Sequence, residues 1–385
     1  REVTPWGGMR LFKEFYDQTG MREQLTSAGL PAASGSNAGF DPVVVMESFW
    51  MTMWLGGQRF AHTAIVRFDS ALKKIFGWKR VPSVSTFTRF FRKFNRSDVD
   101  RVFNSINAWF FSQMPERKIT LDLDSTVLTR FGKQEGSLIG YNPKRPGRPS
   151  HHPIIAFVAD LRMIAHSWLR SGNTGTNNGA KLFLSETMAI LGKQHIGLLR
   201  ADSGFFDGDF FDDLEAKSLD YTIAVRMNKI IKEKIEAVRG WIKVDGGIEC
   251  AEFQYQAGSW SHPRRVAVIR QLVEERPQAS GKYLFDMHDY RYQAWVTNLQ
   301  LPAPEIWRLY RQRADSENRI EELKYDFGVN GFCLQKFYAT EAAFRSAMIA
   351  YNLISLFRQA VLGVKIQPRL HSLRFKCFAI GSWIG

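Results

Sequence analysis

Four side chains that can bind metal and phosphate lie at helical spacing late in the chain. They are Tyr310, Arg313, Glu317 and Lys324, separated by 3, 4 and 7 residues. At about 100° per residue, a helix places all four within an arc of about 60°. A carboxylate between two cations can hold a metal ion while the cations bind phosphate oxygens. The simpler alternative is an Arg313–Glu317 ion pair at i,i+4 on a solvated helix face.

The order Tyr-x2-Arg-x3-Glu-x6-Lys resembles a signature of one large group of bacterial insertion-sequence DDE transposases, which carry it around their third metal-binding residue. All four positions match in this sequence. The resemblance implies that Glu317 is a metal ligand and that Tyr310, Arg313 and Lys324 position DNA phosphates near the cut. It also implies two metal-binding aspartates upstream, each at the end of an apolar strand.

The first upstream candidate lies on an expected strand at 118–128, where apolar and polar residues alternate. This period of 2 is typical of a strand with one buried and one polar face. Asp122 and Asp124 share the polar face, so either can bind metal, and either can equally be a solvated residue on the strand rim. The transposase group places its first aspartate directly before a Ser/Thr-Thr pair, as in Asp124-Ser125-Thr126. We therefore choose Asp124 and keep Asp122 as the alternative.

The second candidate, Asp202, ends a short apolar run that starts at His195, and a helix is expected at 209–219. Open α/β sheets place their sites at the carboxyl ends of strands, although such an aspartate is often only a turn residue or a helix cap. The transposase group has its second aspartate after a similar strand, which favours Asp202 as a metal ligand. Many members follow that aspartate with Arg. This chain has Ser203 at that position, so the phosphate contact that an arginine would make there is not expected from this residue.

Asp124, Asp202 and Glu317 form a D-D-E set in chain order. Phosphodiester transfer requires charge neutralisation on an in-line transition state, which two divalent ions about 4 Å apart supply. Mg²⁺ prefers oxygen ligands and keeps several waters, so a few carboxylates are enough to bind it. We therefore expect two Mg²⁺ ions at this site, with Mn²⁺ able to substitute.

Composition is consistent with a chain that acts on nucleic acid. The 385 residues are 45% hydrophobic and carry a net charge of +14, with a pI near 9.7, which indicates a polyanionic partner. No uncharged apolar stretch of about 18 residues and no signal peptide occurs, so no membrane partner is expected. The three cysteines lie far apart and fit a reducing compartment as buried or free thiols. Because the chain begins at Arg1 without a methionine, we expect native terminal residues to be missing.

Residues 1–115 are expected to be mostly helical, with helices at 41–55 and 83–94. The second of these mixes phenylalanines with three cations that either follow a phosphate backbone or are solvated charges of an ordinary amphipathic helix. They are Arg89, Arg92 and Lys93. The resemblance implies that this helical amino-terminal region binds the DNA ends of the element.

A basic loop rich in Gly and Pro follows the first aspartate, at 130–149. Its cations Lys144, Arg145 and Arg148 are expected to contact DNA phosphates, because long basic loops beside active strands are usually functional. The alternative is an exposed connector. A similar segment follows the first aspartate in the transposase group.

The predicted elements give an α/β fold. Three strands, a helix, the Asp202 strand and another helix follow in order, which suits an RNase H-like core, as the resemblance also implies. We expect this core at 116–220 and 301–385, with the Glu317 helix starting near Pro304 and an apolar helix at 339–362. A β-rich insertion at 221–300 separates the two parts. In relatives, an insertion aromatic holds a flipped base; Trp295 and Trp260 are candidates for that role, or are core residues.

Taken together, the resemblance implies a DNA transposase that cleaves the element ends and transfers the strands, by cut-and-paste with hairpin ends. The expected partners are double-stranded DNA (inverted repeats and target) and a second copy of the chain, in a dimeric synaptic complex in the bacterial cytoplasm, at the nucleoid. Two alternatives stay open: a catalytically silent DNA-binding relic, and an RNase H-like DNA nuclease without strand transfer.

Overall fold

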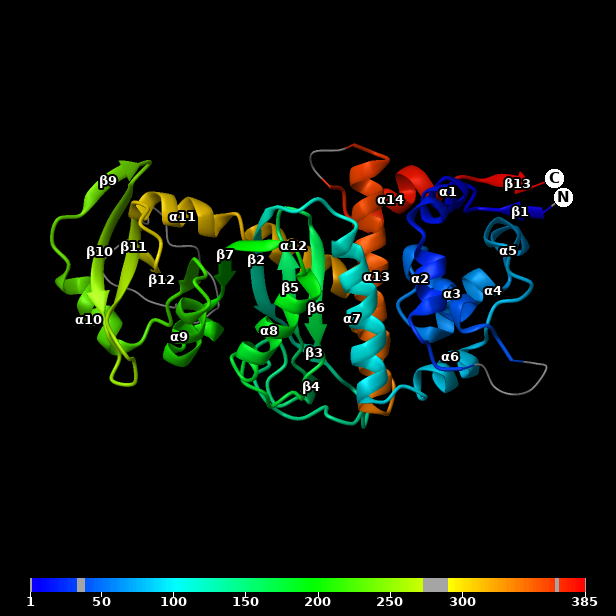
Figure 1. Ribbon diagram of the computed structural model, residues 1–385, viewed down its shortest axis with the longest axis horizontal. Coiled ribbons are helices and arrows are strands. Elements are labelled where there is room, and N and C mark those ends of the chain that lie inside the picture. Colours follow the sequence, from blue (N-terminus) through cyan, green and yellow to red (C-terminus); the bar gives the residue numbers. More distant parts are fainter. Residues whose placement is uncertain (1, 33–38, 273–289, 364–366, 385) are drawn as a thin grey trace.

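The computed structural model describes residues 2–32, 39–272, 290–363 and 367–384. Figure 1 shows an elongated molecule with a helical part at one end, a sheet in the centre and a strand-rich part at the other end. The two termini lie together at the helical end, where β1 (Glu2–Thr4) pairs antiparallel with β13 (Ser382–Ile384). In the described ranges no helix is long and apolar enough to cross a membrane. The three cysteines are free thiols.

The amino-terminal part is helical, as predicted. Its helices are α1 (Met9–Thr19), α2 (Met21–Ser27), α3 (Pro42–Trp54), η1 (Phe60–Thr63), α4 (Ala64–Arg67), α5 (Ser70–Phe76), α6 (Val84–Phe91) and α7 (Arg96–Ser112). Helix α3 starts with Pro42 after Asp41, whose carboxylate accepts from the Val43 amide at 2.9 Å, a standard N-cap. Helix α6 buries its phenylalanines, whereas Arg89 is exposed.

One nine-stranded mixed sheet runs through the centre and the strand-rich end, in the order β6-β5-β2-β7-β8-β12-β11-β10-β9. The strands are β2 (Lys118–Ser125), β5 (Ile154–Val158), β6 (Met163–Trp168), β7 (His195–Ala201), β8 (Tyr221–Ala224), β9 (Ile242–Asp245), β10 (Ile248–Tyr255), β11 (Arg264–Leu272) and β12 (Tyr290–Thr297). Strand β7 is parallel to both β2 and β8, and the other neighbours are antiparallel. A small sheet pairs β3 (Leu128–Thr129) with β4 (Ser150–His151).

The described residues of 221–300, the segment predicted to be mainly β, supply five strands, β8 to β12, which pair antiparallel with one another. The segment also contains a helix that was not predicted, α10 (Lys229–Ala237), which the Asn228 side chain caps and which buries Ile231 and Ile235. The sheet does not stop before this segment. Strand β8 pairs with β7 on one side and with β12 on the other, so the central sheet continues into the strand-rich end.

Helices cover the sheet and join it to the amino-terminal part. They are α8 (Ala180–Leu191), η2 (Ser203–Phe205), α9 (Gly208–Ala216), α13 (Phe337–Ala360), α14 (Leu370–Leu373) and η3 (Arg374–Phe378). Helix α13 packs against β6, α7 and α3, and α7 also packs against β6 and α8. Helix α13 therefore stands between the helical part and the sheet (Figure 1). The apolar helix predicted at 339–362 corresponds to α13.

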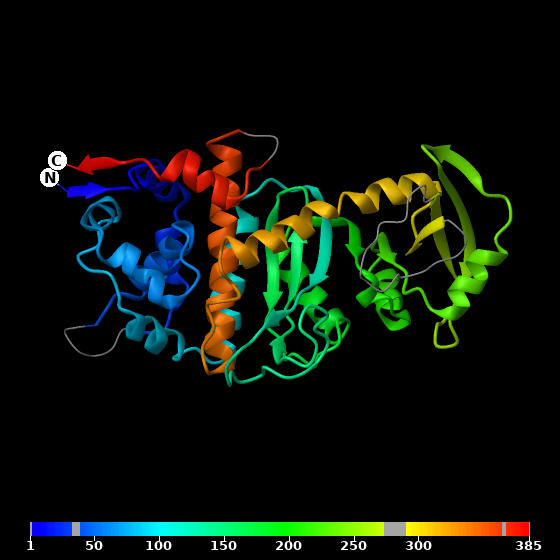
Figure 2. The same ribbon diagram turned by 180° about the vertical axis from the view of Figure 1, so that it is seen from behind.

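One helix was predicted to start near Pro304 and to carry all four signature residues. That prediction is wrong in one respect, because the structure has two helices there. The predicted helix is divided into α11 (Ala303–Arg311) and α12 (Ala314–Tyr325), with a turn at Gln312 and Arg313. Helix α11 packs on β10 and β11, whereas α12 packs on α13. Figure 2 shows the two helices running from the strand-rich end to α13. Gln312 and Arg313 keep right-handed helical backbone angles, and the hydrogen bonds Arg313 N to Tyr310 O and Ser316 N to Arg313 O form a tighter turn between the two helices.

Candidate active site

Asp124 and Asp202 lie at the carboxyl ends of neighbouring parallel strands. Strands β2 and β7 pair Leu123 with Ala201, so the two aspartates follow at the same level of the sheet. The Asp202 carboxylate accepts a hydrogen bond from the Gly204 amide at 2.9 Å, which fixes the turn after β7. This register brings together two residues that the sequence predicted as one site.

Arg313 connects the first aspartate to the glutamate. Its guanidinium nitrogens lie 2.8 Å from Asp124 Oδ2 and 2.8 Å from Glu317 Oε1, and the side chain is only 3% exposed. It also donates to the Leu123 carbonyl at 3.3 Å. The Arg313–Glu317 ion pair at i,i+4 therefore exists, but Arg313 is buried against β2 rather than solvated. The break before α12 leaves Arg313 facing the strand that carries Asp124.

The electrostatics show that the three carboxylates lie close together. Burial raises the pKa of Asp124 to about 6, the Arg313 charge lowers it, and the charges of Asp202 and Glu317 raise it. Burial also raises the pKa of Tyr310 to about 12, so its hydroxyl stays protonated. Burial lowers the pKa of Lys324, with the Lys144 charge acting in the same direction and Asp124 opposing it. Because all of these charges act on one another, they belong to one site.

A cavity of about 530 Å³ opens beside these residues. Asp202 lies in its wall, together with three cations, Lys144, Arg226 and Lys324. Of the basic loop, Lys144 lines the cavity, whereas Arg145 and Arg148 are exposed outside it and lie over the Phe131 ring, at 5.2 and 5.9 Å from its centroid. Carboxylates next to a cation-lined cavity can hold divalent ions and a phosphate backbone together.

The model of the family described as transposase DDE domain group 1 matches residues 1–385, the whole chain. The chain belongs to this DDE transposase family. Membership supports a transposase function, with the nuclease or transposition activity of the family, which generally uses divalent metal ions.

A solved structure with a similar fold is described as the cryo-EM structure of a piggyBac transposase synaptic complex with hairpin DNA. The TM-score is 0.53 at 11% sequence identity, over 97% of this chain and 81% of that chain. At this identity the likeness concerns the fold alone, a mixed α/β architecture with a large mixed sheet. No protein with a curated description matches the chain.

One cation of this candidate site was not predicted. Arg226 follows β8, the third of the parallel strands, and donates to the Ser203 carbonyl at 3.5 Å. It thus brings a guanidinium next to Ser203, the position where many relatives carry Arg. The signal available in the sequence was a polar residue at the end of a third strand, but the parallel pairing of β8 with β7 was needed to interpret it.

The alternative residue Asp122 has a different role from Asp124. It is 1% exposed, and Arg200 binds it with two nitrogens at 2.6 and 2.9 Å. Ser316 on α12 donates to the same carboxylate at 2.5 Å. Both oxygens of Asp122 are therefore used within the protein, where they tie β2 to β7 and to the Glu317 helix.

The two candidate base-stacking tryptophans are core residues. Trp295 is 2% exposed, with its ring 5.4 Å from that of Tyr310. Trp260 is 6% exposed and packs among aromatic rings that include Phe211 and Tyr255. Of the two interpretations that the sequence left open, burial favours the core for both.

A second acidic cluster lies near the strand-rich end. Asp212, Glu215 and His262 have ligand atoms within 4.8 Å of one another, the only such group of three in the ranges that the structure describes. Arg264 already neutralises both acids, at 2.5 Å from Asp212 and 2.7 Å from Glu215. The carboxylates of this cluster are therefore already paired within the protein.

Proposed function

We propose that this chain is a DNA transposase that cleaves the ends of its element and joins them to target DNA, by cut-and-paste with hairpin ends. The observation that carries the proposal is the convergence of Asp124, Asp202 and Glu317 around the buried Arg313, beside a cation-lined cavity. Family membership supports the same reaction class.

Asp124, Asp202 and Glu317 would hold the divalent metal. Arg313 contacts one oxygen each of Asp124 and Glu317, which leaves Asp124 Oδ1 and Glu317 Oε2 outside that contact. All three donors are hard oxygens, as Mg²⁺ and Mn²⁺ prefer. When bound, the two ions would supply activation of the attacking oxygen and stabilisation of the leaving oxygen.

The remaining residues of the site would bind and orient DNA. Lys324, Lys144 and Arg226 line the cavity and would neutralise phosphates on either side of the cut. Tyr310, which stays protonated, would donate to a phosphate oxygen. Arg313 holds Asp124 and Glu317 through its two terminal nitrogens and is 3% exposed, so it would keep both carboxylates in place.

We assign the parts of the chain accordingly. Residues 116–220 and 301–385 form an RNase H-like catalytic core, 221–300 the insertion, and 1–115 the region that binds element ends. The exposed cations Arg145 and Arg148 would extend the DNA contact beyond the cavity. Two copies would hold both ends in a synaptic complex, acting at the nucleoid of a bacterial cell. The similar fold of a transposase described in such a complex supports this assembly.

The proposal is tested with DNA that carries the terminal repeats found on either side of the gene. Wild-type protein with Mg²⁺ should cut this DNA at the repeat ends, and removal of the metal with EDTA should stop cleavage. Specific binding without cleavage in Mg²⁺ or Mn²⁺ would instead indicate a DNA-binding relic. Cleavage without joining to a target plasmid would indicate a nuclease.

A further inference from the structure

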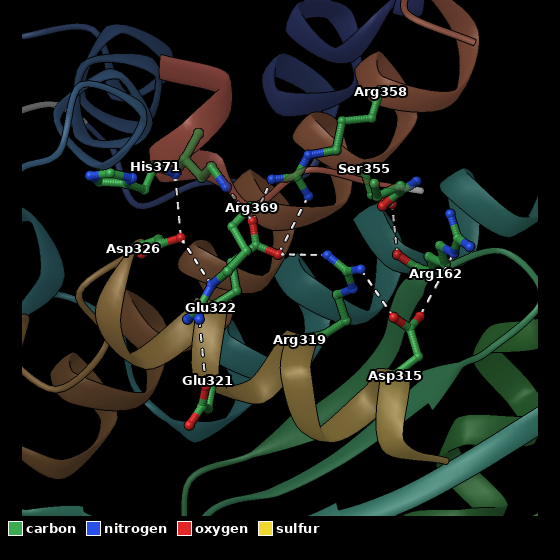
Figure 3. Close-up of polar contacts among 12 residues, drawn as sticks. Arg162, Asp315, Arg319, Glu321, Glu322, Asp326, Ser355, Arg358, Arg369 and His371 are labelled. Carbon is green, nitrogen blue, oxygen red and sulfur yellow. Dashed lines mark hydrogen bonds and ion pairs between the residues drawn. The ribbon is translucent and has the colours of Figure 1, made fainter. Parts of the chain in front are cut away.

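Helix α12 carries a network of charged side chains whose centre is buried (Figure 3). At its centre Glu322 and Arg358 are both 0% exposed. Glu322 Oε1 accepts from Arg358 and from the Leu370 amide, the latter at 2.7 Å. Its other oxygen contacts Arg319 at 3.2 Å and Arg358 at 3.4 Å. Every oxygen of this carboxylate is therefore held by groups from α12, α13 and the segment that leads into α14.

The network continues to the central sheet. Arg319 donates to Asp315 at 3.0 Å, and the other oxygen of Asp315 lies 3.7 Å from Arg162 in the turn between β5 and β6. Ser355 of α13 donates to the Arg162 carbonyl at 2.7 Å. The helix that carries Glu317 is thus fixed, on its back face, to α13 and to the same sheet that carries Asp124 (Figure 3).

A contribution to folding stability is a weak explanation for the buried Glu322–Arg358 ion pair. Removing two charges from water is costly, and replacement of a buried ion pair by apolar residues of similar volume is often neutral or stabilising. The ion pair fixes the orientation of α12 relative to α13, because an arginine fork binds a carboxylate in one geometry. A helix that is held by such a fork has little freedom to rotate about its axis.

Glu322 follows Glu317 by five residues, which places the two side chains about 140° apart around the helix. Lys324 follows Glu317 by seven residues and lies on nearly the same side as Glu317. A rotation of α12 would therefore move Glu317 and Lys324 together, away from Asp124 and the cavity. A displacement of about 1 Å at a reacting centre is enough to slow catalysis greatly.

We infer that the Glu322–Arg358 pair is a positioning device for the catalytic helix, which sets the rotation of α12 so that Glu317 and Lys324 face the cavity. The inference rests on the proposed function. It concerns two residues that are 0% exposed, so their effect on the reaction would pass through Glu317 and Lys324.

The test compares two double variants of the full chain. Glu322→Met with Arg358→Met removes the pair and fills its place with long apolar side chains. The matched control is Glu341→Met with Arg345→Met. That pair is also buried, with 3.3 Å between Arg345 Nε and Glu341 Oε1, and it lies on α13, where Arg345 faces Asp100 of α7 instead of α12.

For both double variants we would measure the unfolding temperature, the DNA affinity and the single-turnover cleavage rate at saturating DNA. We expect both variants to fold and to bind DNA as the wild type does. Cleavage in Mg²⁺ should fall at least about tenfold for the Glu322–Arg358 variant only, with partial recovery in Mn²⁺, whose coordination is less demanding than the near-ideal octahedron of Mg²⁺. An equal loss of cleavage rate in both double variants would overturn the inference. So would a folded Glu322–Arg358 variant that cleaves at the wild-type rate.

If the Glu322–Arg358 double variant does not fold, the single variant Arg358→Lys tests the inference instead. Lysine keeps the charge but not the fork, so the cleavage rate should still drop while DNA affinity stays the same; an unchanged rate would contradict the inference. Failure of the proposed function would look different, because the wild-type protein itself would then show no metal-dependent cleavage.

Discussion

The guanidinium of Arg313 lies 2.8 Å from Asp124, and its second nitrogen lies 2.8 Å from Glu317. One buried side chain thereby joins the strand of the first aspartate to the helix of the glutamate, although the whole strand-rich segment intervenes in the sequence. The contact holds the two parts of the site in register.

Arg313→Lys should lower the cleavage rate strongly, by about a hundredfold, because one ammonium cannot hold two carboxylates in the plane of a guanidinium. DNA affinity should change little, since other cations of the site and of the loop remain. Single-turnover cleavage and DNA binding by anisotropy, measured side by side, check this. A lysine variant that cleaves at the wild-type rate would show that the fork is dispensable.

Arg226→Ala should reduce cleavage by about tenfold if its guanidinium neutralises a phosphate next to Asp202. Arg226→Lys should lose less, because it keeps the charge. The relevant measurement is the cleavage rate at saturating DNA, with total DNA binding as the reference. Identical rates for the alanine and lysine variants would argue that Arg226 only braces the Ser203 turn.

The basic loop is tested by salt dependence. Lys144→Ala with Arg148→Ala should weaken DNA binding and reduce the slope of log affinity against log salt by about 2, because each phosphate contact contributes about 0.9. The control removes two exposed cations at the opposite, amino-terminal ends of β2 and β7, Lys118→Ala with Lys193→Ala. An equal change in the control slope would mean that the loop contributes only net charge.

His166 should make the fold sensitive to acid. It is fully buried, with its ring 4.8 Å from that of Phe183, and burial lowers its pKa from 6.5 to about 4, against the opposing effect of Glu186. A folded-state pKa below the unfolded value means that stability is complete above about pH 6.5 and is lost as pH falls towards 4, by roughly 3 kcal/mol. Thermal unfolding between pH 7 and 4 measures this.

In the same pH series, His166→Phe should flatten the curve, because no proton is then taken up on unfolding at this position. A variant at the exposed His371 should leave the curve as it is in the wild type. If His166→Phe keeps the full pH dependence, another group is responsible for the loss of stability.

Much of this architecture follows from local sequence signals. Alternation at 118–128 and the apolar run before Asp202 correspond to β2 and β7, and the Asp41-Pro42 pair starts α3 where a capping residue followed by proline predicts it. Because parallel strands bring their carboxyl ends to one edge, the neighbourhood of Asp124 and Asp202 could also be anticipated.

The remaining features depend on contacts between distant segments. Nothing near Arg313 in the sequence signals a helix break, after which α12 packs on α13 while α11 packs on the strand-rich end. The different surroundings of Asp122 and Asp124 could not be read from the sequence either, because the partners of Asp122, Arg200 and Ser316, come from β7 and α12. The burial of Trp295 against Tyr310 could not be predicted from local sequence either, because the two residues come from different elements, β12 and α11.

The central claim is that Asp124, Asp202 and Glu317 act together as the metal-binding residues of a transposase. The most direct measurement is strand transfer of pre-cut element ends into a target plasmid with Mg²⁺ or Mn²⁺, for the wild type and for Asp124→Asn, Asp202→Asn and Glu317→Gln, with end binding measured in parallel. We expect joined product for the wild type alone and nearly unchanged end binding for all four proteins. Near-native joining by any of the three variants would contradict the assignment of that residue, and absence of joining by a wild-type protein that binds the ends would contradict the proposed activity.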